Sequence, residues 1–139
     1  MGFNLRVYYG DTDAEGVVYH GAYVNFYDHA RTEFFRSLGI ESGNLVARNC
    51  VFAVKKISLE YLSPSFLDDL LHIKTVITGM GKTRLKIEQS ISNSRGEVIN
   101  QCEVVLFFVD LLKKKVVAIP SDIFDRLIQS EKKVVNKEY

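Results

Sequence analysis

The spacing of apolar residues predicts one long helix in the first third of the chain. We expect the helix to cover residues 21–38 and Gly39 to end it. Its apolar arc covers about half of the circumference, so other elements should wrap around it. The apolar residues that recur at intervals of three and four, the period of an amphipathic helix, include Tyr23, Phe26, Tyr27, Ala30, Phe34 and Leu38.

A period of two replaces the helical period after Asn49 and predicts strands. An earlier strand is expected over residues 3–9. Residues 79–81 and 93–96 carry turn-forming residues, so we expect short connections and antiparallel pairing between the later strands. The alternating apolar residues form three groups: Ile57, Leu59 and Tyr61, then Leu71, Ile73 and Ile77, then Leu85, Ile87 and Ile91.

The last long strand is predicted over residues 98–109 and ends in an unbroken apolar run from Val104 to Val109. Such a run predicts burial on both faces, against the helix on one side and a second subunit on the other. Ser121 is expected to cap a short helix that a charged tail follows. The order of elements predicts an α+β fold, a single domain over residues 1–139 in which one antiparallel sheet curls around one central helix.

Composition narrows the class of protein. The chain has 139 residues, of which 47% are hydrophobic and 25% charged, as in an ordinary globular domain. Its net charge of +1 argues against a nucleic-acid partner. The longest apolar run is far shorter than the roughly twenty residues of a transmembrane helix, and no signal peptide is evident, so we expect a cytoplasmic protein without a transmembrane segment. Cys50 and Cys102 are expected to be free thiols.

The candidate chemistry lies in the polar loop over residues 11–20, which joins the first strand to the helix. Its acids match the start of an EF-hand loop, but Ala22 stands where the bidentate glutamate should be, so we expect no metal. The chain contains no G-x-S-x-G motif and no glycine-rich phosphate loop. A carboxylate before a helix N-terminus remains, where unpaired N–H groups can stabilise an oxyanion. The competing interpretation is that Asp13 only caps the loop and His20 only packs.

Several short motifs support the hydrolytic interpretation, and they extend over most of the chain. At these motifs the chain resembles the hotdog-fold acyl-CoA thioesterases, in the YbgC-like branch of the 4-hydroxybenzoyl-CoA thioesterase family. The motifs are Arg6-Val7-Tyr8-Tyr9, Asp11-Thr12-Asp13, Gly16-Val17-Val18-Tyr19-His20, Tyr23, Ala30-Arg31-Thr32-Glu33, Glu60-Tyr61 and Leu67-Asp68-Asp69.

The resemblance implies hydrolysis of an acyl-CoA thioester to a free acid and coenzyme A, with no cofactor apart from the coenzyme A of the substrate. Asp13 corresponds to the catalytic carboxylate, as general base or nucleophile, and Tyr9 and His20 fall on active-site positions. The N-terminus of the central helix would be the oxyanion site. Further candidates for substrate binding are Tyr19, Gly21, Tyr23, Glu33, Lys82 and Arg84, with the basic residues, or alternatively Lys113 to Lys115, facing the phosphates of coenzyme A.

The resemblance also implies a homodimer or homotetramer whose site is shared between subunits. Acyl carrier protein is an alternative carrier of the acyl group. A non-catalytic module that binds acyl-CoA or acyl carrier protein is the alternative function, because one fold can serve both purposes. The sequence leaves open the acyl preference and the choice between the two roles of Asp13.

Overall fold

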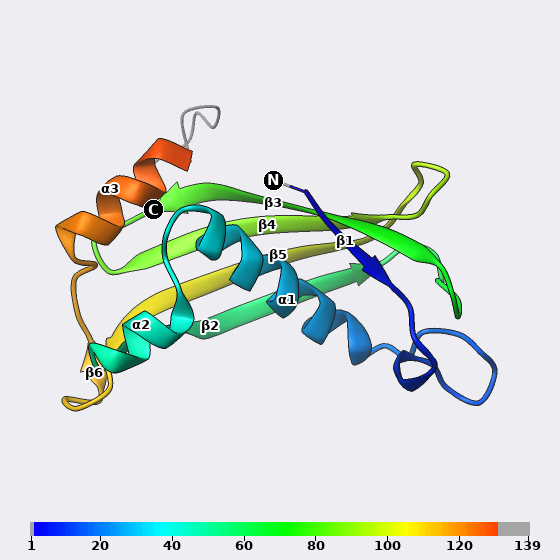
Figure 1. Cartoon of the computed structure of the whole chain (residues 1–139), viewed down its shortest axis with the longest axis horizontal. Coiled ribbons are helices and arrows are strands. Elements are labelled where there is room, and N and C mark those ends of the chain that lie inside the picture. Colours follow the sequence, from blue (N-terminus) through cyan, green and yellow to red (C-terminus); the bar gives the residue numbers. More distant parts are fainter. Residues whose placement is uncertain (1, 131–139) are drawn as a thin grey trace.

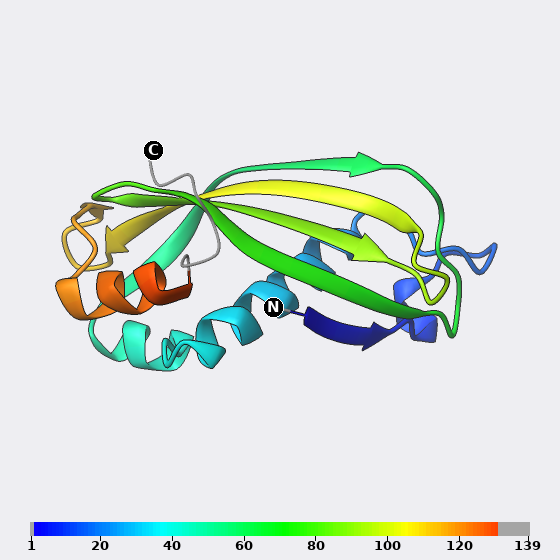
Figure 2. The same ribbon diagram turned by 90° about the horizontal axis from the view of Figure 1, so that it is seen from above.

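One curled antiparallel sheet wraps around the helix α1 in the computed structural model, which describes residues 2–130 (Figures 1 and 2). This is the predicted hotdog arrangement. The order of strands in the sheet is β1-β3-β4-β5-β2, and the short β6 pairs with β5. The elements are β1 (Gly2–Arg6), the 3-10 turn η1 (Tyr9–Asp11), α1 (Ala22–Ser37), α2 (Ser42–Ala47), β2 (Cys50–Tyr61), β3 (Leu70–Met80), β4 (Arg84–Ser92), β5 (Val98–Asp110), β6 (Lys115–Val116) and α3 (Ser121–Ser130).

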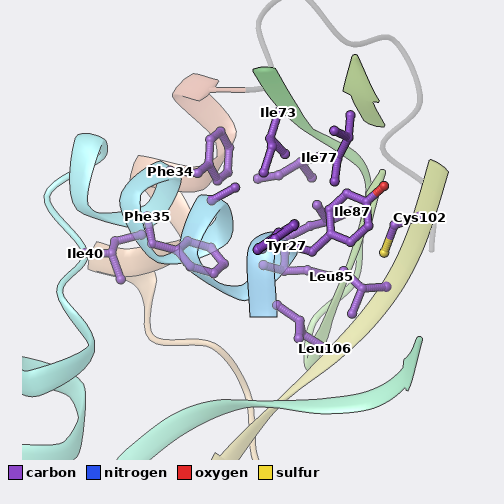
Figure 3. Packing of buried hydrophobic residues seen from close by; sticks show 14 of the residues in the cluster. Tyr27, Phe34, Phe35, Ile40, Ile73, Ile77, Leu85, Ile87, Cys102 and Leu106 are labelled. Carbon is purple, nitrogen blue, oxygen red and sulfur yellow. The ribbon is translucent and has the colours of Figure 1, made fainter. Parts of the chain in front are cut away.

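Helix α1 occupies the predicted segment and supplies the centre of the core. Figure 3 shows its aromatic side chains lying against apolar residues of the sheet. Gly39 adopts a φ of +80° directly after the helix, a conformation that favours glycine and confirms the predicted stop. The buried residues of α1 are Ala22, Tyr23, Phe26, Tyr27, Ala30, Arg31, Phe34 and Phe35.

Strands β3 and β4 confirm the predicted period of two, because their inward residues are almost completely buried and their outward residues are not. In β2 the predicted residues Ile57 and Leu59 are only partly buried, and Tyr61 is half exposed. In β5 the same alternation holds: Val104 and Phe108 are buried, whereas Phe107 is only partly covered. The inner face of this strand is therefore buried as predicted, and burial of its outer face against a second subunit stays a prediction. The Phe107 ring lies on the outer side of the sheet, where the cationic groups of Lys55 and Arg84 lie over it.

Two predicted boundaries are corrected. The first strand ends at Arg6, because the side chain of Asp11 accepts a hydrogen bond from the backbone N–H of Tyr8 at 2.9 Å and a 3-10 turn follows. Gly79 does not lie in a turn. It belongs to β3, beside a register shift in the pairing with β4. The turn to β4 begins after Met80, and the N–H of Gly81 closes it by donating to the carbonyl of Arg84.

Neighbours in sequence are not always neighbours in the sheet. Strand β2 pairs along its whole length with β5, although β3 follows it in the chain. It forms one edge of the sheet, and β1 forms the other. Of the described helices, none is long and apolar enough to cross a membrane.

A buried polar network joins α1 to the sheet. Arg31 is 6% exposed and donates to the side-chain oxygen of Gln89 at 3.1 Å. The amide nitrogen of Gln89 in turn donates to the backbone carbonyl of Tyr27 and to the hydroxyl of Thr75. Asp28 adds an ion pair to Arg31 at 3.6 Å. Burial lowers the pKa of Arg31, and the charge of Asp28 opposes that effect.

Helix α3 closes one end of the core. The predicted short helix is present and begins at Ser121 itself, with Ile123 and Leu127 buried. Arg126 donates to the carbonyl of Leu38 at 3.1 Å and so satisfies a carbonyl at the end of α1. The predicted charged tail after this helix lies outside the described residues.

Candidate active site

The polar loop between β1 and α1 forms a tight hairpin. Thr12 and Val18 form an isolated antiparallel bridge, and the N–H of Asp13 donates to the carbonyl of Val17 at 2.9 Å. The turn closes where the N–H of Gly16 donates back to the carbonyl of Asp13, and Gly16 has a φ of +79°. The loop therefore presents its residues in one defined arrangement.

Asp13 stands at the start of this turn with an exposed side chain. Its Oδ1 accepts hydrogen bonds from the N–H groups of Glu15 at 2.9 Å and Val17 at 3.4 Å. Within residues 2–130, no donor reaches its Oδ2. The capping function considered for Asp13 is thus present. It uses one carboxylate oxygen and leaves the other open to solvent.

The segment before β3 is joined to the loop by backbone hydrogen bonds. The N–H of Val18 donates to the carbonyl of Ser65 at 2.9 Å, and the N–H of Leu67 donates to the carbonyl of Gly16 at 3.1 Å. Ser65 is fully buried, and its hydroxyl lies 2.7 Å from that of Tyr23. No function was predicted for Ser65, although the quoted motif Leu67-Asp68-Asp69 lies in the same segment.

The N-terminus of α1 lies immediately after the loop. Gly21 is the residue before the helix, and the N–H of Ala22 already donates to the carbonyl of Tyr19. Among the described residues, the backbone N–H groups of His20 and Gly21 have no acceptor. These two free donors lie at the positive end of the helix dipole, so they are suited to an anionic oxygen.

The side chains predicted at the active site are not enclosed. Tyr9 is 82% exposed and Tyr19 is 41% exposed. The side chain of His20 has no hydrogen-bond partner among residues 2–130. A Cβ atom at Gly21 would lie 3.1 Å from the ring of Tyr19, so glycine allows this close packing. In the single chain the candidate site is an open surface.

Tyr23 lies in the core rather than on this surface, being 3% exposed. Its ring contacts the edges of Phe26 and Tyr61, and burial raises the pKa of its hydroxyl, which therefore stays protonated. These contacts support the interpretation of Tyr23 as a core residue. Substrate contact by Tyr23 stays a prediction.

Glu33 forms an ion pair within helix α1. Its Oε1 lies 3.3 Å from the Nε of Arg36, and both side chains are nearly half exposed. Glu33 lies on the later half of α1, away from the loop that carries Asp13. Its predicted contact with substrate is untested.

Lys82 and Arg84 lie at the end of the molecule opposite Asp13. Lys82 lies in the turn between β3 and β4, next to α3, and Arg84 is the first residue of β4, whereas the polar loop lies beside the start of β3 (Figure 1). A strand as long as β3 covers about 30 Å at the usual rise per residue. The structure does not bring these basic residues to the Asp13 of the same chain. Lys113 to Lys115, between β5 and β6, lie at that distant end as well.

No group of three or more histidine, cysteine, aspartate or glutamate residues is placed to hold a metal ion within residues 2–130.

The fold and the loop define a class of protein. Residues 7–127 match the family model of the thioesterase-like superfamily, and the chain belongs to this family. By class it is a thioester hydrolase. It is 46% identical over 119 residues to the acyl-CoA thioester hydrolase YbgC of Escherichia coli, with 86% of this chain and 89% of the relative covered.

A second relative and a solved structure agree with this placement. The chain is 36% identical over 122 residues to the acyl-CoA thioesterase YbgC of Haemophilus influenzae, covering 87% of this chain and 89% of the relative. The DHNA-CoA thioesterase of Staphylococcus aureus superposes with a TM-score of 0.89 at 19% identity, covering 98% of this chain and 97% of that one. The latter likeness shows that the fold is shared.

Proposed function

We propose that this protein hydrolyses acyl-CoA thioesters and that Asp13 provides the reacting carboxylate. The observation that carries the proposal is the position of Asp13, which has one carboxylate oxygen held by loop amides and the other free, on the loop that leads into α1. The relatives named acyl-CoA thioester hydrolase support the choice of substrate.

The backbone N–H groups of His20 and Gly21 would stabilise the negative charge that forms on the thioester oxygen. When water or a carboxylate attacks the thioester carbonyl, its oxygen becomes an oxyanion, and two N–H donors at a helix N-terminus can bind it. A backbone donor costs little reorganisation because the helix holds it in place. In this mechanism the backbone N–H of His20 contributes in any orientation of the imidazole ring of His20.

Asp13 has two chemically distinct routes. As a general base it takes a proton from water, which attacks the carbonyl and expels the thiolate of coenzyme A. As a nucleophile it forms a mixed anhydride, expels the same thiolate and is released when water hydrolyses the anhydride. Single turnover in ¹⁸O-labelled water distinguishes them, because attack of water at the Asp13 carboxyl carbon of the anhydride labels the enzyme, whereas the general-base route labels only the released acid.

The single chain leaves this site open to solvent, so we propose that a second copy encloses it. Water exclusion strengthens the electrostatic interactions on which an oxyanion site depends. The edge strand β2 has unpaired backbone groups along one side in the single chain, and strands of this kind readily pair with another chain. A second copy could also supply basic residues for the phosphates of coenzyme A, since Lys82 and Arg84 lie too far away within one chain.

The test is a thiol-release assay with short-chain, long-chain and aromatic acyl-CoAs, and with acyl-carrier-protein thioesters as the alternative substrates. We expect turnover of at least one acyl-CoA. Stoichiometric binding of acyl-CoA without any release of thiol would instead support the non-catalytic binding module.

A further inference from the structure

Tyr61 makes a specific contact with the start of α1. It is the last residue of β2, and its hydroxyl donates to the backbone carbonyl of His20 at 2.8 Å, across 41 positions of sequence. Its ring is held at the same time, because it packs edge-on against the buried ring of Tyr23 with centroids 5.5 Å apart. The side chain of Tyr61 is therefore held by its ring and by its hydroxyl group.

The carbonyl that Tyr61 binds belongs to the same peptide group as the free N–H of Gly21. In a trans peptide the C=O and N–H bonds are coplanar and point in opposite directions. A hydrogen bond on the carbonyl therefore fixes the plane of the group and directs the N–H away from Tyr61. It also polarises the amide, and cooperativity of this kind strengthens the N–H as a donor by about 10–30%.

We propose that Tyr61 is a positioning residue for the oxyanion donor at Gly21. This inference rests on the proposed thioester hydrolysis, and it assigns to Tyr61 an effect on the transition state without contact between Tyr61 and the reacting atoms. The hydroxyl of Tyr61 orients and polarises one peptide group, and that group stabilises the charge that develops on the thioester oxygen.

The helix start does not need Tyr61 for its fold. Other hydrogen bonds already hold it: Ala22 donates to Tyr19, Val24 donates to Gly21, and the N–H of Tyr19 donates to the carbonyl of Asp11 at 3.2 Å. Tyr61 itself is about half exposed, so removal of its hydroxyl leaves the His20 carbonyl to mobile solvent, which does not fix the peptide plane, and creates no buried unsatisfied group. A purely structural function of the hydroxyl therefore predicts little change in either stability or catalysis after its removal.

The test is Tyr61→Phe, which keeps the ring contact with Tyr23 and removes only the hydroxyl. Deletion of a whole oxyanion donor costs on the order of a hundredfold in kcat, and misaligning one should cost less, so we expect kcat to fall by roughly fivefold to twentyfold. We expect KM to change by less than about twofold, because the lost effect exists mainly in the transition state. An unchanged kcat, or a raised KM at unchanged kcat, would overturn the proposal.

Tyr27→Phe is the matched control. Its hydroxyl also donates at 2.8 Å, to the side-chain oxygen of Asn100, but inside the core and away from the His20–Gly21 peptide. We expect this variant to melt at a lower temperature than Tyr61→Phe while keeping the wild-type kcat. If kcat in the two variants fell together in proportion to their loss of stability, Tyr61 would have a structural function only.

A measurement that does not depend on turnover separates this inference from the proposed function. The amide resonance of Gly21 in a ¹H–¹⁵N correlation spectrum should move upfield in Tyr61→Phe, because the preceding carbonyl loses its donor. In Tyr27→Phe it should stay in place. An unmoved Gly21 resonance would contradict the proposal even in a protein with no thioesterase activity, whereas inactivity of the wild-type protein with a shifted resonance would contradict only the proposed function.

Discussion

The hydroxyl groups of Tyr23 and Ser65 lie 2.7 Å apart and join helix α1 to the segment before β3. Both residues are buried, and the carbonyl of Ser65 also accepts the N–H of Val18 in the polar loop. The loop that carries Asp13 is therefore attached to the core through its neighbours as well as through its own turn. Substitution of a single exposed side chain in this loop should leave the loop in place.

We expect Asp13→Asn to lower kcat by about a hundredfold or more, the loss typical of a positioned acid–base group, with little change in KM. Asparagine keeps an oxygen for the N–H groups of Glu15 and Val17, so the variant should lose at most about 1 kcal/mol of stability, the usual value of a cap. Steady-state kinetics and thermal unfolding measure the two effects.

Glu15→Gln is the control for that experiment. It neutralises a second exposed acid in the same loop, two residues from Asp13, and should retain wild-type turnover. Near-normal turnover in a folded Asp13→Asn protein would refute the assignment, and Glu33 would then be the carboxylate to replace.

Gln89→Leu should strongly destabilise the protein. The substitution removes the acceptor of the buried Arg31 guanidinium and the donor to Tyr27 and Thr75. Asp28 still pairs with Arg31 in this variant, but each buried group left without its hydrogen-bond partner costs about 1–3 kcal/mol, and more where it is charged. Urea unfolding should show this loss. Arg95→Gln, which removes the exposed ion pair with Glu97, should cost less than about 1 kcal/mol in the same assay.

The thiol of Cys102 should resist alkylation in the native protein. Burial raises its pKa to about 11, although the nearby charge of Arg31 acts in the opposite direction. Because the folded-state pKa is raised, this thiol contributes stability that is fully present below pH 9, its unfolded value, and is lost as the pH rises towards 11. Iodoacetamide labelling at pH 8, followed by mass spectrometry, should modify Cys102 only after denaturation. Rapid labelling of the folded protein would contradict this description.

The protein should assemble into a homodimer or homotetramer at micromolar concentration. The partly covered outer face of β5, with Val105, Phe107 and Val109, and the edge strand β2 both offer surface to a second copy. Light scattering should give twice or four times the chain mass of 15.8 kDa. A mass of one chain at this concentration would remove the basis for a shared active site.

Periodicity was sufficient to predict the long elements, because side-chain burial imposes it, but the short α2 and β6 were not predicted. The apolar spacing of three and four identified α1 almost to the residue, and alternation identified β3 and β4. Both signals are local: a helix or a strand exposes its faces with a period set by its own backbone. The loop with Asp13 was also found locally, since a polar segment before a buried helix is visible in the sequence, and the resemblance to the thioesterases supplied its chemistry.

Contacts between distant segments could be decided only by the tertiary structure. Nothing in the residues around Tyr61 indicates that its hydroxyl reaches the carbonyl of His20, because that contact depends on where the end of β2 lies relative to α1. The same holds for Lys82 and Arg84, whose charge suggested a phosphate site and whose place in the sheet puts them at the far end. Sequence patterns thus report which backbone each segment adopts and which face it buries. Only the pairing of β2 with β5 and the curl of the sheet around α1 determine which segments meet at the active site.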